Sequence, residues 1–490
     1  MTGRLARWFD DRLGMSRFAR GALNKAFPDH WSFMLGEIAL YCFVVLVLTG
    51  VFLTFFFEPS LEEVVYRGDY EPLRGVSMSQ AYRSTVELSF DVRAGLVVRQ
   101  IHHWAALVFV ASIVCHLARV FFTGAFRRPR EINWVVGVTM LLLALANGFT
   151  GYSLPDDLLS GTGLRIAYSI ALSIPFVGTW LTFLVFGGEF PAEDIITRLF
   201  VIHILLVPAL LAGLMGLHMA ILWRQKHTHF PGPGRREDNV VGSHLWPTYT
   251  AKTLGLFCLV VAVLAALGGL VQINPVWLYG PFEAASVTTA AQPDWYVGWL
   301  EGALRLFPPW DVELFGYTLS EVFFPGVVLP GVTFALLFAW PFLERRVTGD
   351  RAEHQLLDLP RQRPVRTALG VVVLTFYAVL LVAGAQDLVA QALDVSIRPV
   401  LHSLRVLLFV LPALAGLVTW KVCRDLAAAD QFAGVAPVPV VPAADDPSSS
   451  SDDGPPGTAG RLRRWARTAL GVGLAVGAAA AGRRRARRPS

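Results

Sequence analysis

Eight long apolar runs alternate with polar segments along the chain. Each approaches or exceeds the ~20 residues that a helix needs to cross the hydrocarbon core of a bilayer. The runs cover about residues 33–57, 94–122, 133–153, 199–223, 253–273, 322–343, 367–390 and 399–422. The pattern therefore predicts an all-α membrane protein with eight transmembrane helices.

Lysine and arginine concentrate on one side of these predicted helices. They occur in the N-terminal arm and after the second, fourth and sixth runs, whereas segment 58–71 is mostly acidic and segment 274–320 holds one basic residue, Arg305. Basic loops remain on the cytoplasmic side of a membrane. Because the number of helices is even, both termini are expected in the cytoplasm. The plasma membrane is the expected location.

Composition agrees with a membrane protein. Of the 490 residues, 54% are apolar and 16% are charged, and the mean hydropathy is +0.51. Soluble domains contain roughly 25% charged residues, so a soluble enzyme, a disordered chain and a disulfide scaffold are excluded. Nucleic acid is not an expected partner. The cysteines are widely separated and are expected to be small core residues rather than ligands or disulfide partners. They are Cys42, Cys115, Cys258 and Cys423.

Four segments follow from the same patterns. They are a basic arm (1–30), a four-helix bundle (31–230), a C-terminal four-helix part with an outer loop at 274–320 (231–423), and a Pro/Ser-rich mobile linker with a basic tail (424–490). Stretch 466–482 is rich in Ala and Gly and is either a weak ninth span or a surface helix or basic tail. We favour the surface or tail interpretation, since its arginines suit anionic lipid headgroups.

Histidines occur in matched positions within two of the runs. His102 and His116 lie fourteen residues apart in the second run, and His203 and His218 lie fifteen apart in the fourth. Fourteen residues are nearly four helical turns, which places the first two on one face about 21 Å apart. Fifteen overshoot by about 60°, which a slight bend or rotated imidazoles must absorb. Runs two and four cross in the same direction, so His102 can face His203 and His116 can face His218.

Two facing imidazoles, repeated at a second level, are typical of two bis-histidine haem sites. The plain alternative is four core histidines, each hydrogen-bonded within the bundle, and a zinc site would need further ligands. Glycines at the same fourteen-residue interval in runs one and three would leave room for flat macrocycles, although single glycines also serve as small packing residues. They are Gly36, Gly50, Gly137 and Gly151.

Two arginines lie close to the histidines at the two membrane borders. Arg99 precedes His102 by about one turn and Arg119 follows His116 by three residues. Each is interpreted either as a partner of a haem propionate or as an arginine extending to water. His103 points off the face of His102 and is expected to pack or to donate a hydrogen bond rather than to bind iron.

Several motifs give the chain a family resemblance. They are RQIHHW (99–104), CHLARVFFTGAFRRPREINW (115–134), GYSLP (151–155), TRLFVIH (197–203) and QPDWY (292–296). With the paired histidines and glycines, residues 30–420 resemble cytochrome b of the respiratory cytochrome bc complexes. The segments KHTHFPGPG (226–234) and SLPDDLLSGTG (153–163) are similar to the actinobacterial menaquinol branch.

This resemblance implies a quinol:cytochrome c reductase that translocates protons. Quinol, here menaquinol, would be oxidised at the outer face between the loop after run three and loop 280–310. One electron would pass to a Rieske iron–sulfur protein. The other would cross through a low-potential haem b (His102, His203) and a high-potential haem b (His116, His218) to an inner quinone site. The implied partners are a Rieske subunit, a cytochrome c subunit, a haem-copper oxidase in a supercomplex and a second copy of the complex.

The resemblance also assigns the outer quinol site, with a departure. The family's Pro-Glu-Trp-Tyr motif here reads Pro293-Asp294-Trp295-Tyr296. Asp294 would be the general base, with a raised pKa in apolar surroundings, or the N-cap of the helical segment WYVGWLEGAL. Tyr296 would position the quinol, and Tyr152 and Gly163 would line the same pocket.

Two further departures concern the inner side. Photosynthetic relatives carry an additional covalent haem on a cysteine where this chain has Met34, so that haem is not expected. An inner-site aspartate of mitochondrial members aligns with Thr253. The resemblance therefore assigns no residues to the inner quinone site.

Two other functions compete with this interpretation. A haem b membrane anchor of a dehydrogenase or hydrogenase typically has four or five spans and no loop like 274–320. A transporter could use the histidines to carry protons, and it would be colourless.

Overall fold

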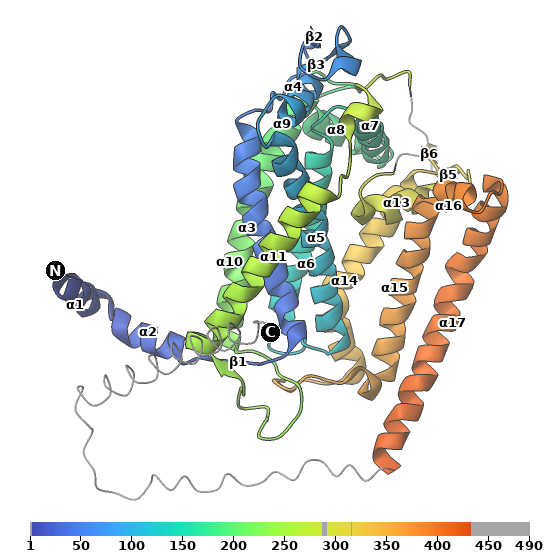
Figure 1. Cartoon of the computed structure of the whole chain (residues 1–490). Coiled ribbons are helices and arrows are strands. Elements are labelled where there is room, and N and C mark those ends of the chain that lie inside the picture. The colour runs from blue at the N-terminus through green and yellow to red at the C-terminus, as the bar shows by residue number, and fades with distance from the viewer. Residues whose placement is uncertain (1, 287–291, 315, 433–490) are drawn as a thin grey trace, which may run out of the picture. The chain divides into compact units, whose positions relative to one another are not determined.

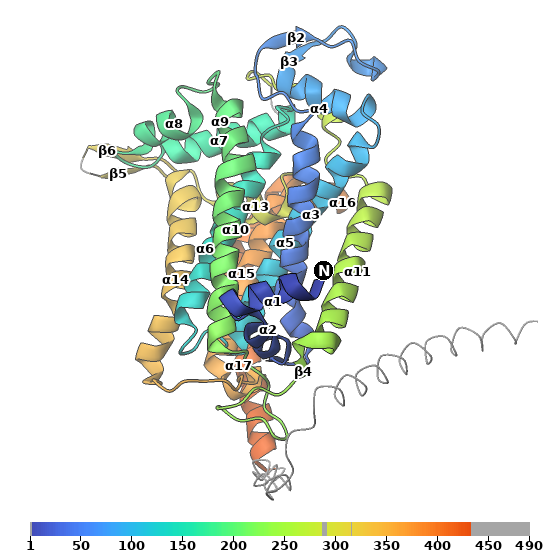
Figure 2. The same ribbon diagram turned by 90° about the vertical axis from the view of Figure 1, so that its left-hand side faces the viewer.

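The computed structural model describes residues 2–286, 292–314 and 316–432, and this part of the chain is built mainly from α-helices (Figure 1, Figure 2). Within it, eight helices are long and apolar enough to cross a membrane. They are Trp31–Thr54, Gly95–Phe122, Glu131–Tyr152, Ile195–Gln225, Leu245–Leu270, Phe324–Thr348, Pro364–Gly384 and Ile397–Ala429. The predicted fold class and all eight spans are confirmed, although the fifth span begins at Leu245 rather than near 253.

The first four spans form the bundle that carries the histidines and glycines. They are α3 (Leu35–Thr54), α5 (Gly95–Phe122), α6 (Glu131–Tyr152), and the continuous run of α9 (Ile195–Val201), a π-helical turn (Ile202–Leu206) and α10 (Val207–Gln225). Helix α3 packs along α5, and α10 packs along α6. The fifth span, α11 (Thr250–Leu270), packs against α3 and α5.

The remaining spans lie on the α6 side of the first four, with α17 outermost (Figure 1). They are α14 (Leu329–Thr348), α15 (Pro364–Gly384) and α17 (Ile397–Phe432). Helix α14 packs against α6, and α15 packs against α5 and α17. Short helix α13 (Trp295–Leu306), which is the predicted segment WYVGWLEGAL, packs on α15 and brings the 292–296 motif to the bundle.

Short elements lie at one end of the membrane spans (Figure 1). They are the β2 (Glu63–Val65) and β3 (Ser77–Ser79) hairpin, α4 (Gln80–Phe90), α7 (Leu158–Leu172), α8 (Gly178–Phe186), α12 (Val276–Tyr279), the β5 (Val312–Leu314) and β6 (Tyr317–Leu319) hairpin, and α16 (Gln386–Ala392). The segment between spans three and four, expected as a loop, is thus helical. Helix α7 is apolar but too short to span a bilayer, so the hydropathy pattern did not separate it from a loop.

The opposite end carries the arginine-rich segments. Its elements are α1 (Thr2–Leu13), α2 (Met15–Leu23), the β1 (Ala26–Phe27) and β4 (Ser243–His244) pair, and single turns at Trp31–Met34, Leu245–Tyr249 and Pro360–Gln362. Further single turns elsewhere are Glu71–Leu73 and Phe324–Val328.

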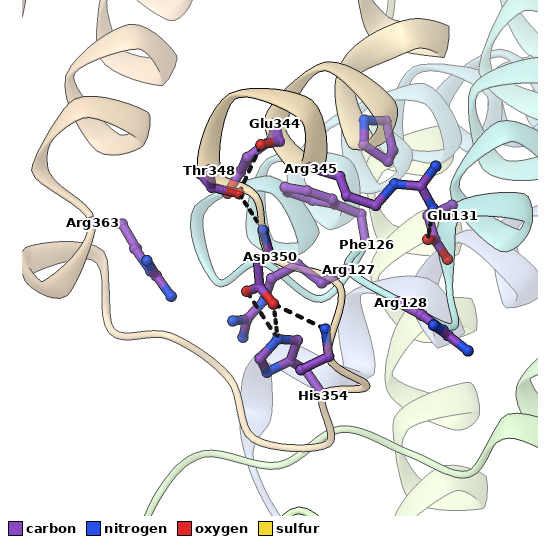
Figure 3. A pocket seen from close by; sticks show the side chains of 12 residues that line it. Phe126, Arg127, Arg128, Glu131, Glu344, Arg345, Thr348, Asp350, His354 and Arg363 are labelled. Atoms are coloured by element: carbon purple, nitrogen blue, oxygen red, sulfur yellow. Dashed lines mark hydrogen bonds and ion pairs between the residues drawn. The ribbon is translucent and has the colours of Figure 1, made fainter.

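Ion pairs lie at this end between the α5–α6 loop and the α14–α15 segment. Figure 3 shows Arg127 of that loop and Glu344 of α14. The buried Arg366 donates to Asp358 at 2.6 Å and to Glu344 at 2.8 Å, and Arg127 lies 3.3 Å from Asp358. Removing one partner of a buried ion pair leaves an uncompensated charge, which is strongly destabilising. These contacts therefore hold the bundle and the C-terminal helices in register.

The cysteine prediction was partly wrong. Cys42 and Cys423 are buried, whereas Cys115 and Cys258 are exposed, and all four are free thiols. The outward face of a membrane span is as apolar as its core, because lipid tails surround it, so an apolar neighbourhood did not reveal which side each cysteine faces. The predicted linker and tail beyond residue 432, including stretch 466–482, lie outside the described residues.

Candidate functional site

The structure brings both predicted histidine pairs together. His102 on α5 and His203 in the π-helical turn have ring centres 6.2 Å apart, with planes at 69°. His116 on α5 and His218 on α10 have ring centres 6.5 Å apart, with planes at 73°. The two pairs are therefore alike in separation and in angle, as expected for two sites of one kind.

These separations fit one metal atom between each pair. An imidazole nitrogen binds a transition metal at about 2 Å, so two rings on opposite sides of one metal have facing nitrogens about 4 Å apart and centres a little over 6 Å apart. Within the described residues, no cluster of three or more His, Cys, Asp and Glu side chains could hold a metal ion. The arrangement favours a metal that brings its own in-plane ligands, such as haem iron, over zinc.

A π-helical turn explains the fifteen-residue spacing. Residues Ile202–Leu206 form this turn, and His203 lies inside it. A π-turn accommodates one extra residue in an α-helix, so fifteen residues that include it advance about as far as fourteen α-helical ones. The expected overshoot is thus absorbed by a change of helix type.

Hydrogen bonds set the orientation of the His102–His203 pair, which is called the outer pair, whereas His116 and His218 are called the inner pair. His102 Nδ1 lies 2.9 Å from Thr49 Oγ1, and His203 Nδ1 lies 2.9 Å from the carbonyl oxygen of Asn147. A ring whose Nδ1 proton is donated to such an oxygen keeps Nε2 free to bind metal. In the inner pair, Nδ1 of His116 and of His218 is buried without a partner among the described residues.

Each predicted glycine lies against one of the four histidine rings. A Cβ added at Gly151 would lie 2.3 Å from His203 Cε1, and one at Gly36 would lie 3.2 Å from His116 Cε1. The corresponding distances are 3.3 Å for Gly50 to His102 and 3.9 Å for Gly137 to His218. The glycines therefore make room first for the imidazoles, and most tightly at Gly151.

The two arginines beside the histidines are largely enclosed. The Arg99 side chain donates to the Asn274 carbonyl oxygen at 3.1 Å, and the Arg119 guanidinium lies 4.9 Å from the centre of the Phe33 ring. In both, Nε is buried without a partner among the described residues. An unpartnered donor beside each histidine pair fits an anionic group such as a haem propionate.

One cavity joins the outer histidine pair to the 292–296 motif. It has a volume of about 430 Å³, and the residues at its wall include Arg99 and Tyr152. The predicted residues that line it are Gly50, His102, Gly151, His203, Asp294 and Tyr296. The predicted haem residues and quinol residues thus share one space.

Asp294 connects two elements within this cavity. Its Oδ1 lies 2.7 Å from His103 Nε2, and its Oδ2 accepts a hydrogen bond from the Tyr296 hydroxyl at 3.0 Å. Asp294 occupies the N-cap position of α13, but its side chain accepts no capping hydrogen bond from the main-chain amides of that helix. The carboxylate is therefore directed into the cavity and does not cap α13. Burial and the adjacent carboxylate raise the pKa of Tyr296 well above its usual value, so its hydroxyl remains a proton donor.

Other predicted lining residues surround this group. The Tyr152 hydroxyl is buried without a partner among the described residues, which leaves a donor for a bound molecule. A Cβ added at Gly163 would lie 3.4 Å from the Tyr152 ring, so Gly163 bounds Tyr152. Neither Gly163 nor Pro293 is among the residues at the cavity wall.

Sequence reasoning did not assign the residues that hold this motif. Gln292 Nε2 donates to Asp387 Oδ1 at 2.9 Å, and Arg305 Nη1 donates to the same oxygen at 3.1 Å. Asp387 on α16 thus fixes both the residue before Pro293 and the far end of α13. The available signal was Arg305, the single basic residue of segment 274–320.

Comparisons with known proteins show similarity to one family. The family described as cytochrome b (N-terminal)/b6/petB matches residues 107–281. The cytochrome bc1 complex cytochrome b subunit of Streptomyces coelicolor is 50% identical over 429 residues, which are 87% of this chain and 78% of that protein. The subunit of the same name from Mycobacterium tuberculosis is 51% identical over the same shares of both chains.

A solved structure has the same fold. A chain of a hyperthermophilic respiratory Complex III superposes with a TM-score of 0.62 and 19% identity, and the match covers 85% of this chain and 99% of that one.

Proposed function

The chain belongs to the family of cytochrome b subunits of cytochrome bc1 complexes, and we propose from this premise how its residues divide the work of the complex. As a family member, it is a subunit of the quinol:cytochrome c reductase known as complex III. It is a multi-pass protein of the bacterial plasma membrane. Haem b, quinone, and Rieske and cytochrome c subunits accompany the family.

Two non-covalent haem b groups are the first element of the proposal. His102 and His203 hold the low-potential haem, and His116 and His218 hold the high-potential haem. The ring separations of 6.2 and 6.5 Å support this assignment. When bound, the two haems supply one-electron carriers at two depths of the membrane. No covalent third haem is proposed, because Met34 replaces the cysteine that would hold it.

Quinol oxidation is assigned to the cavity of about 430 Å³ beside the outer pair. Asp294 accepts a proton from a quinol hydroxyl, and Tyr296 positions the quinol. A carboxylate has about four lone-pair sites, so Asp294 can accept this proton while His103 and Tyr296 still hold its two oxygens. Tyr152 offers a free hydroxyl, and Pro293 and Gly163 shape the surroundings. One electron would leave to the Rieske subunit, and the other would pass to the haem that His102 and His203 would hold.

The charge distribution orients the chain in the membrane, and this orientation gives the direction in which protons would move. The arginine-rich end is assigned to the cytoplasm, with both termini, and the Asp294 cavity to the outer side. Quinol oxidation then releases protons outside, and quinone reduction near the inner pair takes protons from the cytoplasm. Menaquinone is the proposed quinone, on the strength of the actinobacterial relatives. A dimeric complex that associates with a haem-copper oxidase is the proposed assembly.

The observation that carries this proposal is the matched pair of facing histidines on α5 and α9–α10. Each haem has its own pair, so His116→Ala or His218→Ala is expected to remove one haem and to perturb the other less. Pyridine haemochrome analysis of the purified complex measures the haem content. His402→Ala, an exposed histidine of α17, is the control that retains both haems. Two haems in either test variant would contradict the assignment.

A further inference from the structure

A carboxylate lies inside the first membrane span, near the inner histidine pair. Glu37 is in the first turn of α3. An ionisable side chain in a span is expensive to bury and marks a functional site by default. The positive end of the helix dipole favours an acid at this position. It does not explain the side chains that converge on Glu37 from other helices.

Three hydroxyl groups surround the Glu37 carboxylate. Thr253 Oγ1 of α11 donates to Oε2 at 2.6 Å, and the Tyr41 hydroxyl donates to the same oxygen at 3.3 Å. The Tyr249 hydroxyl donates to Oε1, and Tyr41 and Thr253 also share a hydrogen bond with each other. The carboxylate is therefore held from α3, from the turn before α11, and from α11 itself.

The identity of these partners is informative. Within the described residues, Glu37 forms no ion pair, and its hydrogen bonds go to hydroxyl groups. A lysine or arginine would hold the carboxylate in its charged form only. A hydroxyl can both donate and accept, so this arrangement satisfies the ionised and the protonated carboxyl alike. Such a group can release a proton and take one up without leaving its site.

Glu37 is also close to the inner pair. The preceding residue, Gly36, approaches His116 so closely that a Cβ would lie 3.2 Å from its ring. Arg119, three residues after His116, covers the Phe33 ring at the start of the same span. Glu37 therefore lies one residue along α3 from the position that contacts the inner histidine pair.

A connection to the arginine-rich surface lies next to it. Lys252 Nζ pairs with Asp29 Oδ1 at 2.5 Å, and both side chains are about half exposed. Lys252 is the neighbour of Thr253, and Tyr249 stacks on Phe27 with ring centres 4.4 Å apart. The hydroxyl cluster thus lies one residue along α11 from a half-exposed ion pair at the arginine-rich end.

We propose that Glu37 is the carboxylic acid that delivers a proton to quinone at the inner site. This inference rests on the proposed function, because the electrons come from quinol oxidised at the outer site. Reduction of one quinone takes two electrons and two protons. Glu37 gives one proton to a quinone carbonyl oxygen, so that its own O–H bond breaks as the new O–H bond forms. The second proton comes from cytoplasmic water, and the Glu37 carboxylate is reprotonated from the same side.

The test uses Glu37→Gln in the whole purified complex. Quinol is expected to reduce the haems in the first turnover at the normal rate, while a short-chain naphthoquinone reoxidises the inner haem about 10²-fold more slowly. In infrared difference spectra of quinone reduction, a carboxyl C=O band should be lost. Glu131→Gln is the matched control, because Glu131 lies at the same border but pairs with the half-exposed Arg345. It should behave as wild type.

A rescue variant separates chemistry from structure. Since Thr253 Oγ1 lies 2.6 Å from Glu37 Oε2, Thr253→Asp places a carboxyl at nearly the same point. Glu37→Gln/Thr253→Asp is therefore expected to recover reoxidation. Normal reoxidation in Glu37→Gln would overturn the inference. A double variant that keeps both haems but reoxidises slowly would overturn it as well. If Glu37→Gln alone loses a haem, the double variant decides the question. Failure of wild-type haems to accept electrons from quinol would instead reject the proposed function.

Discussion

Oδ1 of Asp294 lies 2.7 Å from Nε2 of His103, the residue that directly follows His102 on α5. Neighbouring residues on a helix point about 100° apart. One step along α5 therefore turns from a ring that faces His203 to a ring that holds the carboxylate of the quinol motif. The same helix turn positions both halves of the outer site, and displacing it would affect both.

The role of Asp294 is tested by Asp294→Asn. The variant should fold and keep both haems, because the side chain is near-isosteric and does not cap α13. Loss of the proton acceptor should slow quinol oxidation about 10²-fold or more. Asp294→Glu, which restores the family's longer carboxylate, should retain substantial activity. Steady-state reduction of cytochrome c by quinol is the measurement.

A second aspartate of the same outer segment provides the control. Asp311 is exposed, and its side chain accepts only the Glu321 amide among the contacts described. Asp311→Asn should therefore leave the rate unchanged. If Asp294→Asn turned over at the wild-type rate, Asp294 would have no part in proton transfer.

Asp387 accepts hydrogen bonds from Gln292 and Arg305 and is expected to position the Asp294 motif. Asp387→Asn weakens the contacts to Gln292 and Arg305 and should let the Asp294 motif shift. We expect kcat/KM for quinol to fall about tenfold, which is less than the 10² that a misplacement of about 1 Å can cause. The haem spectra should be unchanged, and the pH profile should keep its shape because the acceptor group is the same. Asp394→Asn, at an exposed site just beyond α16, is the control.

The spans and the histidine pairs could be predicted because their signals are periodic. The length of an apolar run is enough to identify a membrane helix. A fourteen-residue interval on one helix places His102 and His116 on the same face, independently of the rest of the chain. The π-helical turn at His203 could not be predicted, because helix type there follows from packing against α6. His103 and Asp294 are 191 residues apart, so no local pattern connects them.

The same distinction applies to Glu37 and the outer helices. Thr253 is 216 residues from Glu37 in the sequence, and only the packing of α11 against α3 brings the two together. Helices α7 and α8 are apolar but short, and α8 exposes the apolar side chains of Trp180, Phe183 and Leu184. Their apolar residues therefore carry neither the length of a span nor the clear alternation of an exposed amphipathic helix.

The glycines predict a graded series of haem losses. Gly151→Ala places a Cβ 2.3 Å from the His203 ring, which must then move, whereas Gly137→Ala makes only ordinary contact with His218 at 3.9 Å. The complex with Gly151→Ala should lose the outer haem, and that with Gly137→Ala should keep both. Gly36→Ala and Gly50→Ala, at 3.2 and 3.3 Å, should give intermediate haem contents. Equal haem contents across the four variants would show that the glycines do not accommodate the rings.

The last prediction concerns Asp156, which accepts a hydrogen bond from Ser79 of β3 at 2.6 Å. Burial raises the pKa of Asp156 from 3.8 to about 7; the neighbouring Asp157 adds to this rise and the Ser79 hydrogen bond opposes it. The folded protein therefore keeps a proton that the unfolded chain loses above about pH 4. By linkage, stability should fall as pH rises from about 4 to 7 and then level off, by an amount on the order of a few kcal/mol.

Asp156→Asn removes this titration and keeps an oxygen for Ser79, and asparagine tolerates the left-handed backbone (φ 54°) at this position. The apparent thermal midpoint of the solubilised complex, followed by haem absorbance, should therefore be higher in the variant than in wild type at pH 8. The difference should shrink as the pH is lowered towards 5, because the wild-type carboxyl becomes neutral in the folded state. Asp69→Asn is the control for a general effect of charge removal. Asp69 lies between β2 and β3 at the same end of the molecule, and its main-chain amide donates to Asp91. A difference between Asp156→Asn and wild type that does not change with pH would mean that Asp156 does not titrate in this range.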